Sequence, residues 1–323
     1  MANIAVLGFG TVGSGVVEVI SAGGISEKAG EDVYVKKILD IRTFDDSPFK
    51  DRITSDFESI LNDDSISIVV ETMGGCNPAY DFSKRCLLAG KSVVTSNKEL
   101  VATHGVELMK IAREKGISYM FEASVGGGIP VIRPIIQCLA ADEITEIMGI
   151  LNGTTNYILA QMINNGISFE EALKEAQEKG YAEKDPTADI EGYDTRRKIA
   201  ILSSLCFGKA VDDSKIPTQG ITNITLEDVA AAEKKGCVIK LIGHSVKNPD
   251  GSIFAEVKPM ELPKDNPLSG IEGVFNGILI KGSITGDVMF YGRGAGKKPT
   301  ASAVIADVVD IIRNGNTNAP YWE

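Results

Sequence analysis

The sequence predicts an α/β fold, in which a doubly wound parallel sheet is joined to a second, α+β domain. Three observations support this prediction. A short strand-like segment at residues 4–7 runs directly into three closely spaced glycines. Strand-like and helical segments then alternate, with short connections, as far as residue 121, which is typical of parallel βαβ units. Beyond residue 122 this alternation stops, and several long strand-like segments follow one another.

The first half is expected to form a sheet of five parallel strands with helices on both faces, because βαβ crossovers are right-handed. The expected strands are residues 4–7, 33–39, 66–70, 93–95 and 117–121. The expected helices lie around residues 16–20, 79–89 and 106–115.

The second half is expected to combine helices with a mixed or antiparallel sheet. Ser168 and Glu171 form a capping-box pattern, which predicts the start of one helix. The expected helices are residues 130–139, 169–179, 194–207 and 225–235. The expected strands are residues 144–151, 238–244, 253–260, 274–280 and 287–291. A last helix at 300–313 is expected to return to the first domain.

Composition excludes several classes of protein. The chain has 323 residues, 43% of them hydrophobic, and a net charge of −11, which argues against nucleic-acid and anionic-membrane binding. No stretch approaches the roughly 18 apolar residues of a membrane span, and no signal peptide is evident. The five cysteines are dispersed, without a Cys-x-x-Cys pair, which indicates reduced thiols in a cytoplasmic protein.

The three glycines after the first strand form the pattern Gly-x-Gly-x-x-Gly. Gly8 permits a tight turn, Gly10 lets a ligand approach the backbone, and Gly13 lets the helix pack against the strand. The helix then offers N–H donors and its positive dipole end to a pyrophosphate. This placement favours dinucleotide binding over the alternative, a plain tight turn.

The end of the second strand gives two conflicting indications about the dinucleotide. An acid, here Asp40, would hold the ribose 2′-hydroxyl of NAD, whereas an arginine, here Arg42, would accept the 2′-phosphate of NADP. The sequence therefore leaves the choice between NAD and NADP open.

The run Ser-Asn-Lys-Glu at 96–99 directly follows the fourth strand. Ligands bind at the carboxyl ends of strands in doubly wound sheets, so Lys98 could reach a substrate or the nicotinamide. The alternative is a helix cap followed by a solvated lysine.

Three consecutive glycines occur at 126–128, within the segment 122–130. Their exposed backbone carbonyls could coordinate a monovalent cation. From the residues alone, we favour the alternative, a turn between the two domains.

The segment 180–198 is rich in carboxylates and leads into a helix. Asp194 and Lys198 are four residues apart and therefore share one helix face. An apolar run at 199–202 suggests that Lys198 is buried, and a desolvated lysine has a pKa shifted toward the working pH. Such an amine can exchange a proton with an alcohol, and nearby carboxylates suit a substrate that carries an ammonium group. The alternative is a surface ion pair in an acidic loop.

Together, these motifs resemble the homoserine dehydrogenase family. The most specific are the run Asn-Gly-Thr-Thr-Asn-Tyr at 152–157 and the pattern Gly-Tyr-x-Glu…Asp…Asp-x-x-x-Lys within 180–198; the glycine pattern alone would not be specific. The matching segments keep the family's order and spacing and span nearly the whole chain: 8–17, 96–105, 121–134, 149–159, 180–198 and 291–296.

The resemblance implies a role for each matching residue. Lys198 resembles the catalytic acid/base, and Lys98 the second active-site lysine, near the nicotinamide and the substrate. The implied substrate-binding residues are Glu183, Asp189 and Asp194. The implied cofactor-binding residues are Gly8, Gly10, Thr11, Val12, Gly13, Thr72, Lys98 and Gly294. The implied positions for a sodium or potassium ion, held largely through backbone oxygens, are Glu122, Val125, Gly127 and Ile129.

The resemblance also implies activity and organisation. The expected reaction interconverts L-homoserine and L-aspartate 4-semialdehyde with NADP or NAD, in threonine and methionine biosynthesis. Residues 1–125, completed by 297–323, would bind the dinucleotide. Residues 126–296 would bind substrate, carry out catalysis and join a homodimer through their sheet. We expect a short form, without the C-terminal ACT regulatory module of many relatives. The alternatives are another oxidoreductase of a small amino-acid alcohol or aldehyde, and a non-catalytic dinucleotide sensor.

Overall fold

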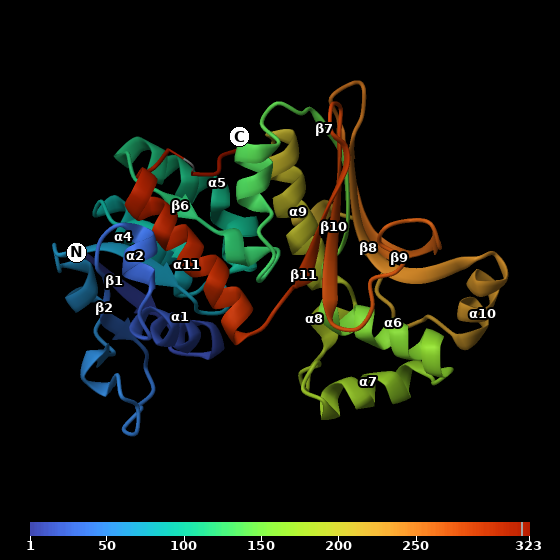
Figure 1. Ribbon diagram of the computed structural model, residues 1–323, viewed down its shortest axis with the longest axis horizontal. Coiled ribbons are helices and arrows are strands. Elements are labelled where there is room, and N and C mark those ends of the chain that lie inside the picture. Colours follow the sequence, from blue (N-terminus) through green and yellow to red (C-terminus); the bar gives the residue numbers. More distant parts are fainter. Residues whose placement is uncertain (318) are drawn as a thin grey trace. The chain divides into compact units, whose positions relative to one another are not determined.

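The computed structural model describes residues 1–317 and 319–323 and divides the chain into two compact units (Figure 1). Unit 1 comprises residues 1–137 together with the C-terminal segment from 295, and unit 2 comprises residues 138–294. Residues 126–137 associate with unit 1 because the Glu122 carboxylate accepts backbone N–H bonds from residues 131–133. Arg133 also pairs with Asp307 at 2.6 Å. The functional boundary expected at residue 125 stays a prediction.

Unit 1 is built on a six-stranded sheet with the order β3-β2-β1-β4-β5-β6, in which every neighbouring pair is parallel. This confirms the predicted doubly wound sheet. The order reverses between β1 and β4, so their carboxyl ends flank the point where such sheets bind ligands. The strands are β1 (Ala2–Leu7), β2 (Val33–Leu39), β3 (Ile53–Thr54), β4 (Ile66–Glu71), β5 (Ser92–Thr95) and β6 (Tyr119–Met120).

The helices of unit 1 include one from the end of the chain, which packs against the first helix (Figure 1). A Cβ atom added at Gly15 would lie 2.9 Å from the carbonyl oxygen of Lys297, so this close approach needs a glycine. The two helices share a hydrophobic core with the sheet. The helices are α1 (Thr11–Ser21), α2 (Ile25–Ala29), α3 (Glu58–Leu61), α4 (Ala79–Leu88), α5 (Lys98–Lys115) and α11 (Lys297–Asn314).

Unit 2 contains a five-stranded sheet with the order β11-β10-β7-β8-β9 and antiparallel pairing throughout. Helix α9 packs on one face of this sheet; a Cβ atom added at Gly243 would lie 3.1 Å from side-chain atoms of Ile199 and Thr195. The strands are β7 (Ile144–Ile150), β8 (Cys237–Lys247), β9 (Ile253–Pro263), β10 (Phe275–Gly282) and β11 (Gly286–Arg293). The helices are α6 (Gly153–Asn165), α7 (Phe169–Glu178), α8 (Thr187–Ile190), α9 (Tyr193–Phe207) and α10 (Leu226–Lys234).

Three helices test the predictions made from the sequence. The capping box of Ser168 and Glu171 at the start of α7 is confirmed. The expected helix at 130–139 is wrong in extent, since the regular part is a π-helical turn at Pro134–Cys138. The carboxylate of Glu122 takes up the N–H groups just before it. Helix α6 was not expected at all. Among the described residues, no helix is long and apolar enough to span a membrane.

Candidate active site

Lys198 lies on the buried face of α9, where its amine has two oxygen acceptors. Its Nζ donates to the carbonyl of Leu151 at 2.8 Å and to Oδ2 of Asp194 at 2.7 Å. Lys198 is only 7% exposed and Asp194 only 3%. The four-residue spacing places both side chains on one helix face, and the end of β7 supplies the carbonyl. The predicted burial of this lysine is therefore observed.

Asn152 is a residue of this site whose role the sequence did not predict. Its amide Nδ2 donates to Oδ1 of Asp189 at 2.7 Å and to Oδ2 of Asp194 at 2.9 Å. Its Oδ1 accepts the backbone N–H of Thr155 and thereby caps α6. One side chain thus starts a helix and orients two carboxylates. The only signal in the sequence was its place at the head of the run 152–157.

The electrostatics of Asp189 differ from those of an exposed aspartate. Burial raises the pKa of Asp189, and the neighbouring charge of Asp194 raises it further. Hydrogen bonds from Asn152 and Thr154 and the positive charge of Lys198 oppose this rise. Two carboxylates and one amine therefore gather at the start of α9, an arrangement that suits a cationic group on a ligand.

Glu183 lies outside this hydrogen-bonded group. It is on an exposed stretch between α7 and α8, and its backbone carbonyl accepts a hydrogen bond from the side chain of Gln177. Its predicted role in substrate binding stays a prediction.

In unit 1, the glycine turn after β1 packs closely against the residues that follow β4. A Cβ atom added at Gly13 would lie 1.9 Å from the carbonyl oxygen of Gly8, so only glycine fits. The Oγ1 of Thr72 donates to the carbonyls of Leu7 and Gly8. At Gly10, by contrast, an added Cβ would meet nothing within 4 Å. Thr11 is the exposed first residue of α1 and Val12 is half-buried, so the helix start is open to a ligand.

Lys98 is the first residue of α5 and is half-buried. The preceding residue, Asn97, caps the helix by accepting the backbone N–H of Leu100 at 3.1 Å. Because of this cap, α5 starts eight residues before the helix predicted at 106–115. Lys98 is thereby fixed at the carboxyl end of β5, the edge of the sheet where ligands bind.

Gly294 follows β11 and packs closely against Asn276. An added Cβ would lie 2.0 Å from Nδ2 of Asn276, which is 1% exposed. A larger residue at this position would therefore displace the loop that is predicted to approach the cofactor.

At the tip of β2, Asp40 and Arg42 form a clamp. Oδ1 of Asp40 accepts the backbone N–H and Nε of Arg42, and Oδ2 accepts Nη2 of Arg42 and the backbone N–H of Phe9. Hydrogen bonding to Arg42 holds the pKa of Asp40 well below its usual range. A hollow of about 250 Å³ lies beside the clamp, with Arg42, Lys50 and Ser55 among its lining residues.

The glycine-rich loop at 122–130 presents main-chain oxygens rather than free carboxylates. The Glu122 side chain already accepts three backbone N–H bonds, from Val131, Ile132 and Arg133. The described structure holds no cluster of three or more His, Cys, Asp or Glu side chains suited to a metal. Among the backbone hydrogen bonds of turns and loops in the described residues, none is accepted by the carbonyls of Val125, Gly127 or Ile129. This donor set fits a monovalent cation held by the backbone.

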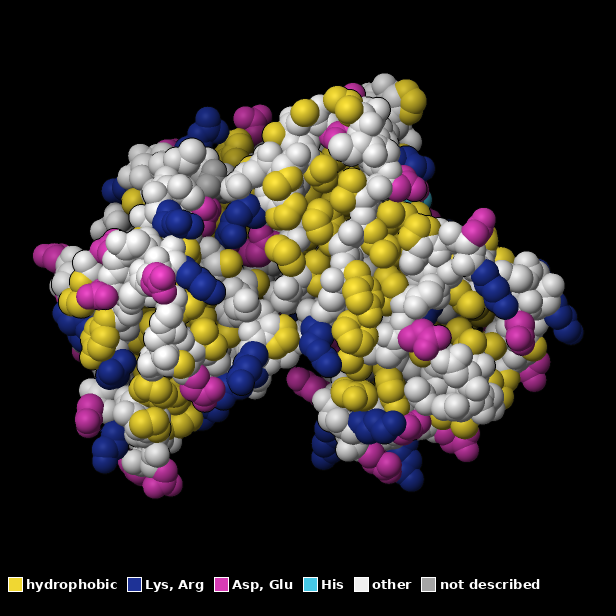
Figure 2. Space-filling model, viewed as in Figure 1, with side chains coloured by type: hydrophobic (Ala, Val, Ile, Leu, Met, Phe, Trp, Pro, Cys, Tyr) yellow, Lys and Arg dark blue, Asp and Glu magenta, His cyan; other side chains and the backbone are white. Residues whose placement is uncertain are grey.

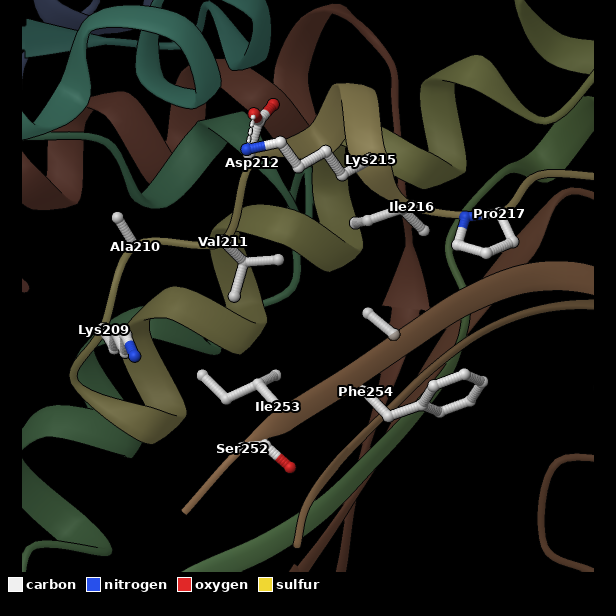
Figure 3. A pocket seen from close by; sticks show the side chains of 11 residues that line it. Lys209, Ala210, Val211, Asp212, Lys215, Ile216, Pro217, Ser252, Ile253 and Phe254 are labelled. Atoms are coloured by element: carbon white, nitrogen blue, oxygen red, sulfur yellow. Dashed lines mark ion pairs between the residues drawn. The ribbon is translucent and has the colours of Figure 1, made fainter. Parts of the chain in front are cut away.

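A larger cavity, of about 450 Å³, lies elsewhere in unit 2, beside the end of α9 (Figure 3). Its lining is mainly apolar, including Val211, Ile216 and Ile253, and an ion pair joins Asp212 and Lys215. None of the predicted site residues lines it, so size alone does not locate the site here.

Comparisons with known proteins agree with this geometry. Residues 8–122 match the family model of the homoserine dehydrogenase NAD-binding domain, and residues 130–309 match that of homoserine dehydrogenase. The chain is similar to the homoserine dehydrogenase of Lactococcus lactis, with 41% identity over 96% of this chain and 74% of that protein. The chain belongs to the homoserine dehydrogenase family. It is therefore an oxidoreductase with an NAD-binding domain.

Solved homoserine dehydrogenases share the fold. The enzyme from Thiobacillus denitrificans superposes with a TM-score of 0.92 at 40% identity, covering 97% of this chain and 73% of that one. A hyperthermophilic archaeal homoserine dehydrogenase, solved in complex with NADPH, superposes with a TM-score of 0.80 at 29% identity, covering 96% of this chain and 97% of that one.

Proposed function

We propose that this member of the homoserine dehydrogenase family interconverts L-homoserine and L-aspartate 4-semialdehyde, with Lys198 as the proton-transferring residue. The observation that carries the proposal is the buried amine of Lys198, held by Asp194 and the carbonyl of Leu151. A lysine shielded from water can exchange a proton with a substrate oxygen.

In the oxidative direction, neutral Lys198 takes the hydroxyl proton of homoserine. The bound dinucleotide would supply the hydride acceptor, C4 of its nicotinamide ring. In the reductive direction, protonated Lys198 returns the proton to the aldehyde oxygen. Lys98 orients the substrate or polarises the same oxygen, the role that the family resemblance implies.

The carboxylates near Lys198 suit the ammonium group of the substrate. Asp189 and Asp194 are held by one amide, that of Asn152. Pre-positioned acceptors lose little freedom when they bind a cation. Glu183, on its exposed stretch, would add a carboxylate as substrate binds.

We infer that NADP is preferred over NAD. All four lone-pair sites of the Asp40 carboxylate are taken by N–H donors of Phe9 and Arg42, so little acceptor capacity is left for a 2′-hydroxyl. The Arg42 side chain is 60% exposed beside a hollow that Lys50 also lines, and such cations suit a 2′-phosphate. The NADPH bound to the archaeal relative supports the same choice.

The cofactor inference is tested by kcat/KM for NADP and NAD in parallel. Arg42→Ala should lower the NADP-to-NAD ratio about tenfold, the size expected for a charge-assisted hydrogen bond. Arg85→Ala is the matched control, because Arg85 pairs with Glu58 on the surface of the same unit. A wild-type enzyme that prefers NAD would overturn the inference.

A sodium or potassium ion is proposed for the loop at 122–130. Backbone oxygens of Val125, Gly127 and Ile129 would hold it, and the ion would stiffen the loop. Melting temperature measured with potassium, sodium and a bulky organic cation tests this. A preference for one alkali ion supports the site, and equal melting with all three contradicts it.

A homodimer and a cytoplasmic location are also proposed. Across the sheet of unit 2, Met289, Leu279 and Met148 form one row on the face away from α9. Met289 is 42% exposed and Tyr291 54%, and apolar side chains gather over this unit in Figure 2. Light scattering of wild type and Met289→Asp tests the dimer, which the variant should weaken.

No disulfide joins the five cysteines of the described structure, which supports a reducing compartment.

The proposed reaction is tested by homoserine-dependent absorbance at 340 nm. The account predicts turnover with L-homoserine that clearly exceeds that with other small amino-acid alcohols. A different preferred alcohol would indicate another oxidoreductase. Dinucleotide binding without any turnover would indicate a non-catalytic sensor.

A further inference from the structure

Glu71 is a buried carboxylate beside the glycine turn that has no part in the chemistry proposed so far. It is the last residue of β4, and it is 0% exposed. Its Oε1 accepts the backbone N–H of Met73 at 2.7 Å, and its Oε2 accepts the hydroxyl of Thr95 at 2.5 Å. Burying a carboxylate is costly unless its oxygens are paired. The identity of its partners therefore indicates what it holds in place.

The first partner leads to the glycine turn. A Cβ atom added at Gly8 would lie 3.1 Å from Cγ of Met73 and 3.3 Å from its backbone nitrogen. The neighbouring Thr72 donates its hydroxyl to the carbonyls of Leu7 and Gly8. Glu71 thus fixes the segment that packs directly on the turn.

The second partner leads to the start of α5. Oγ1 of Thr95 accepts the backbone N–H of Asn97 at 2.9 Å. Asn97 in turn donates its amide to the carbonyl of Gly75 at 2.6 Å and caps the helix that Lys98 begins. The loop at 72–75 and the loop at 96–97 are therefore joined through one carboxylate.

We propose that ionised Glu71 is a positioning residue of the dinucleotide site, which holds the loop at 72–75 and the Lys98 end of α5 in the arrangement that binds the dinucleotide. Protonation of Glu71 releases this arrangement. The part that concerns Lys98 rests on the proposed function, whereas the part that concerns dinucleotide binding does not.

The release follows from the donors and acceptors present. An ionised carboxylate only accepts hydrogen bonds, which suits the donors on Met73 and Thr95. A proton on Oε2 has to be donated to Oγ1 of Thr95, which already accepts the N–H of Asn97. The hydrogen of the Thr95 hydroxyl then loses its acceptor, and the connection to α5 weakens.

The titration falls in a useful range. Burial raises the pKa of Glu71 to about 7, against hydrogen bonds from Thr95, Met73 and Asn97 that lower it. Two titratable groups lie near Glu71. One is the phenol of Tyr119 on β6, whose pKa is raised by burial and by the charges of Glu71 and Cys76, and the other is the thiol of Cys76. Cys76 contacts Glu99, which with Lys98 begins α5.

The test measures the Kd of NADP, without homoserine, from pH 5.5 to 8.5. Wild type should bind about tenfold more weakly at the acid end, the effect of one hydrogen bond to a charged group. Glu71→Gln, which mimics the protonated form, should bind weakly at every pH. Thr95→Val should bind NADP more weakly at the alkaline end as well, because the connection from Glu71 to Asn97 is lost. The pH dependence that remains should have its midpoint at higher pH, because one hydrogen bond that opposes the raised pKa of Glu71 is lost. The exposed, surface-paired Glu58→Gln is the matched control and should follow wild type.

A second readout separates positioning from a purely structural role. Because the folded-state pKa of Glu71 is raised, the cost of its buried charge is fully present above about pH 7 and disappears as pH falls below the ordinary glutamate pKa. Glu71→Gln should therefore melt higher than wild type at pH 8.5, and by less at pH 5.5.

A lower melting temperature of Glu71→Gln at pH 8.5, or a wild-type pH dependence of the Kd that this variant retains, would overturn the proposal. Should Glu71→Gln fail to fold, Thr95→Val decides the matter, since an unmoved midpoint contradicts the proposal. Because homoserine is absent, loss of the proposed dehydrogenase activity would leave the binding result unchanged.

Discussion

The amide of Asn152 and the amine of Lys198 donate to the same atom, Oδ2 of Asp194, at 2.9 and 2.7 Å. These donors come from the start of α6 and from α9, 46 residues apart along the chain by their numbering. The shared acceptor ties the orientation of the amine to the helix start that Asn152 caps. This relationship makes Asn152 a positioning residue for proton transfer.

Asn152→Ser should therefore lower kcat by about ten- to a hundredfold, since hydrogen bonds to one buried and one half-buried carboxylate are lost. Serine can still cap α6, so the free energy of unfolding should change little. Ser168→Ala, which removes the cap of α7 in the same unit, should show the reverse pattern, with about 1 kcal/mol less stability and normal kcat. Parallel changes in kcat and stability for both variants would contradict this role.

The KM for homoserine should rise as pH falls through the raised pKa of Asp189. Burial and the charge of Asp194 raise this pKa, so protonation removes a charge that attracts the ammonium group at a pH above the usual aspartate range of about 4. Asp189→Asn should give a high KM that is flat over the same pH range. Asp185, whose pKa is lowered by hydrogen bonds from Thr187, provides the control: Asp185→Asn should keep the wild-type profile.

Two glycine substitutions separate ligand contact from folding. Gly13→Ala would place a Cβ 1.9 Å from the Gly8 carbonyl oxygen, so it should lower the melting temperature and abolish NADP binding. Gly10→Ala meets no protein atom within 4 Å and should melt like wild type. If the pyrophosphate approaches this backbone, Gly10→Ala should still weaken NADP binding about tenfold or more. Unchanged binding by Gly10→Ala would show that the ligand lies elsewhere.

Local patterns predicted the fold well where they were strong. The strand, glycine turn and helix at the N-terminus and the capping box of α7 are as expected, because each depends on neighbours in the sequence. Helix α6 was not predicted, because Thr154, Thr155 and Asn156 have modest helix propensity. The helix forms because Asn152 caps its start and because many of its side chains are buried. The early start of α5 depends likewise on the cap at Asn97.

The chemistry of the site was harder to predict, since it depends on contacts distant in the sequence. The spacing of Asp194 and Lys198 gave their pairing, whereas the hydrogen bonds from Asn152 span 37 and 42 residues. Asp40 and Arg42 suggested rival cofactors as separate residues. In the structure, Arg42 donates hydrogen bonds to both oxygens of Asp40. This pairing, which the sequence does not reveal, supports our inference that NADP is preferred. Glu71 carried no sequence signal, because its partners Met73 and Thr95 lie on a loop and at the end of another strand, β5.

In the proposed reaction, the buried amine of Lys198 moves the proton. This role is tested most directly by comparing Lys198→Met with wild type in homoserine-dependent absorbance at 340 nm, together with the Kd of NADP for both proteins. The account predicts that kcat falls about 10²–10⁴-fold, the usual contribution of a general acid or base, while the Kd changes by less than about twofold, well under the tenfold that 1.4 kcal/mol represents. A variant that loses NADP affinity as much as turnover, or that keeps its turnover, would contradict it.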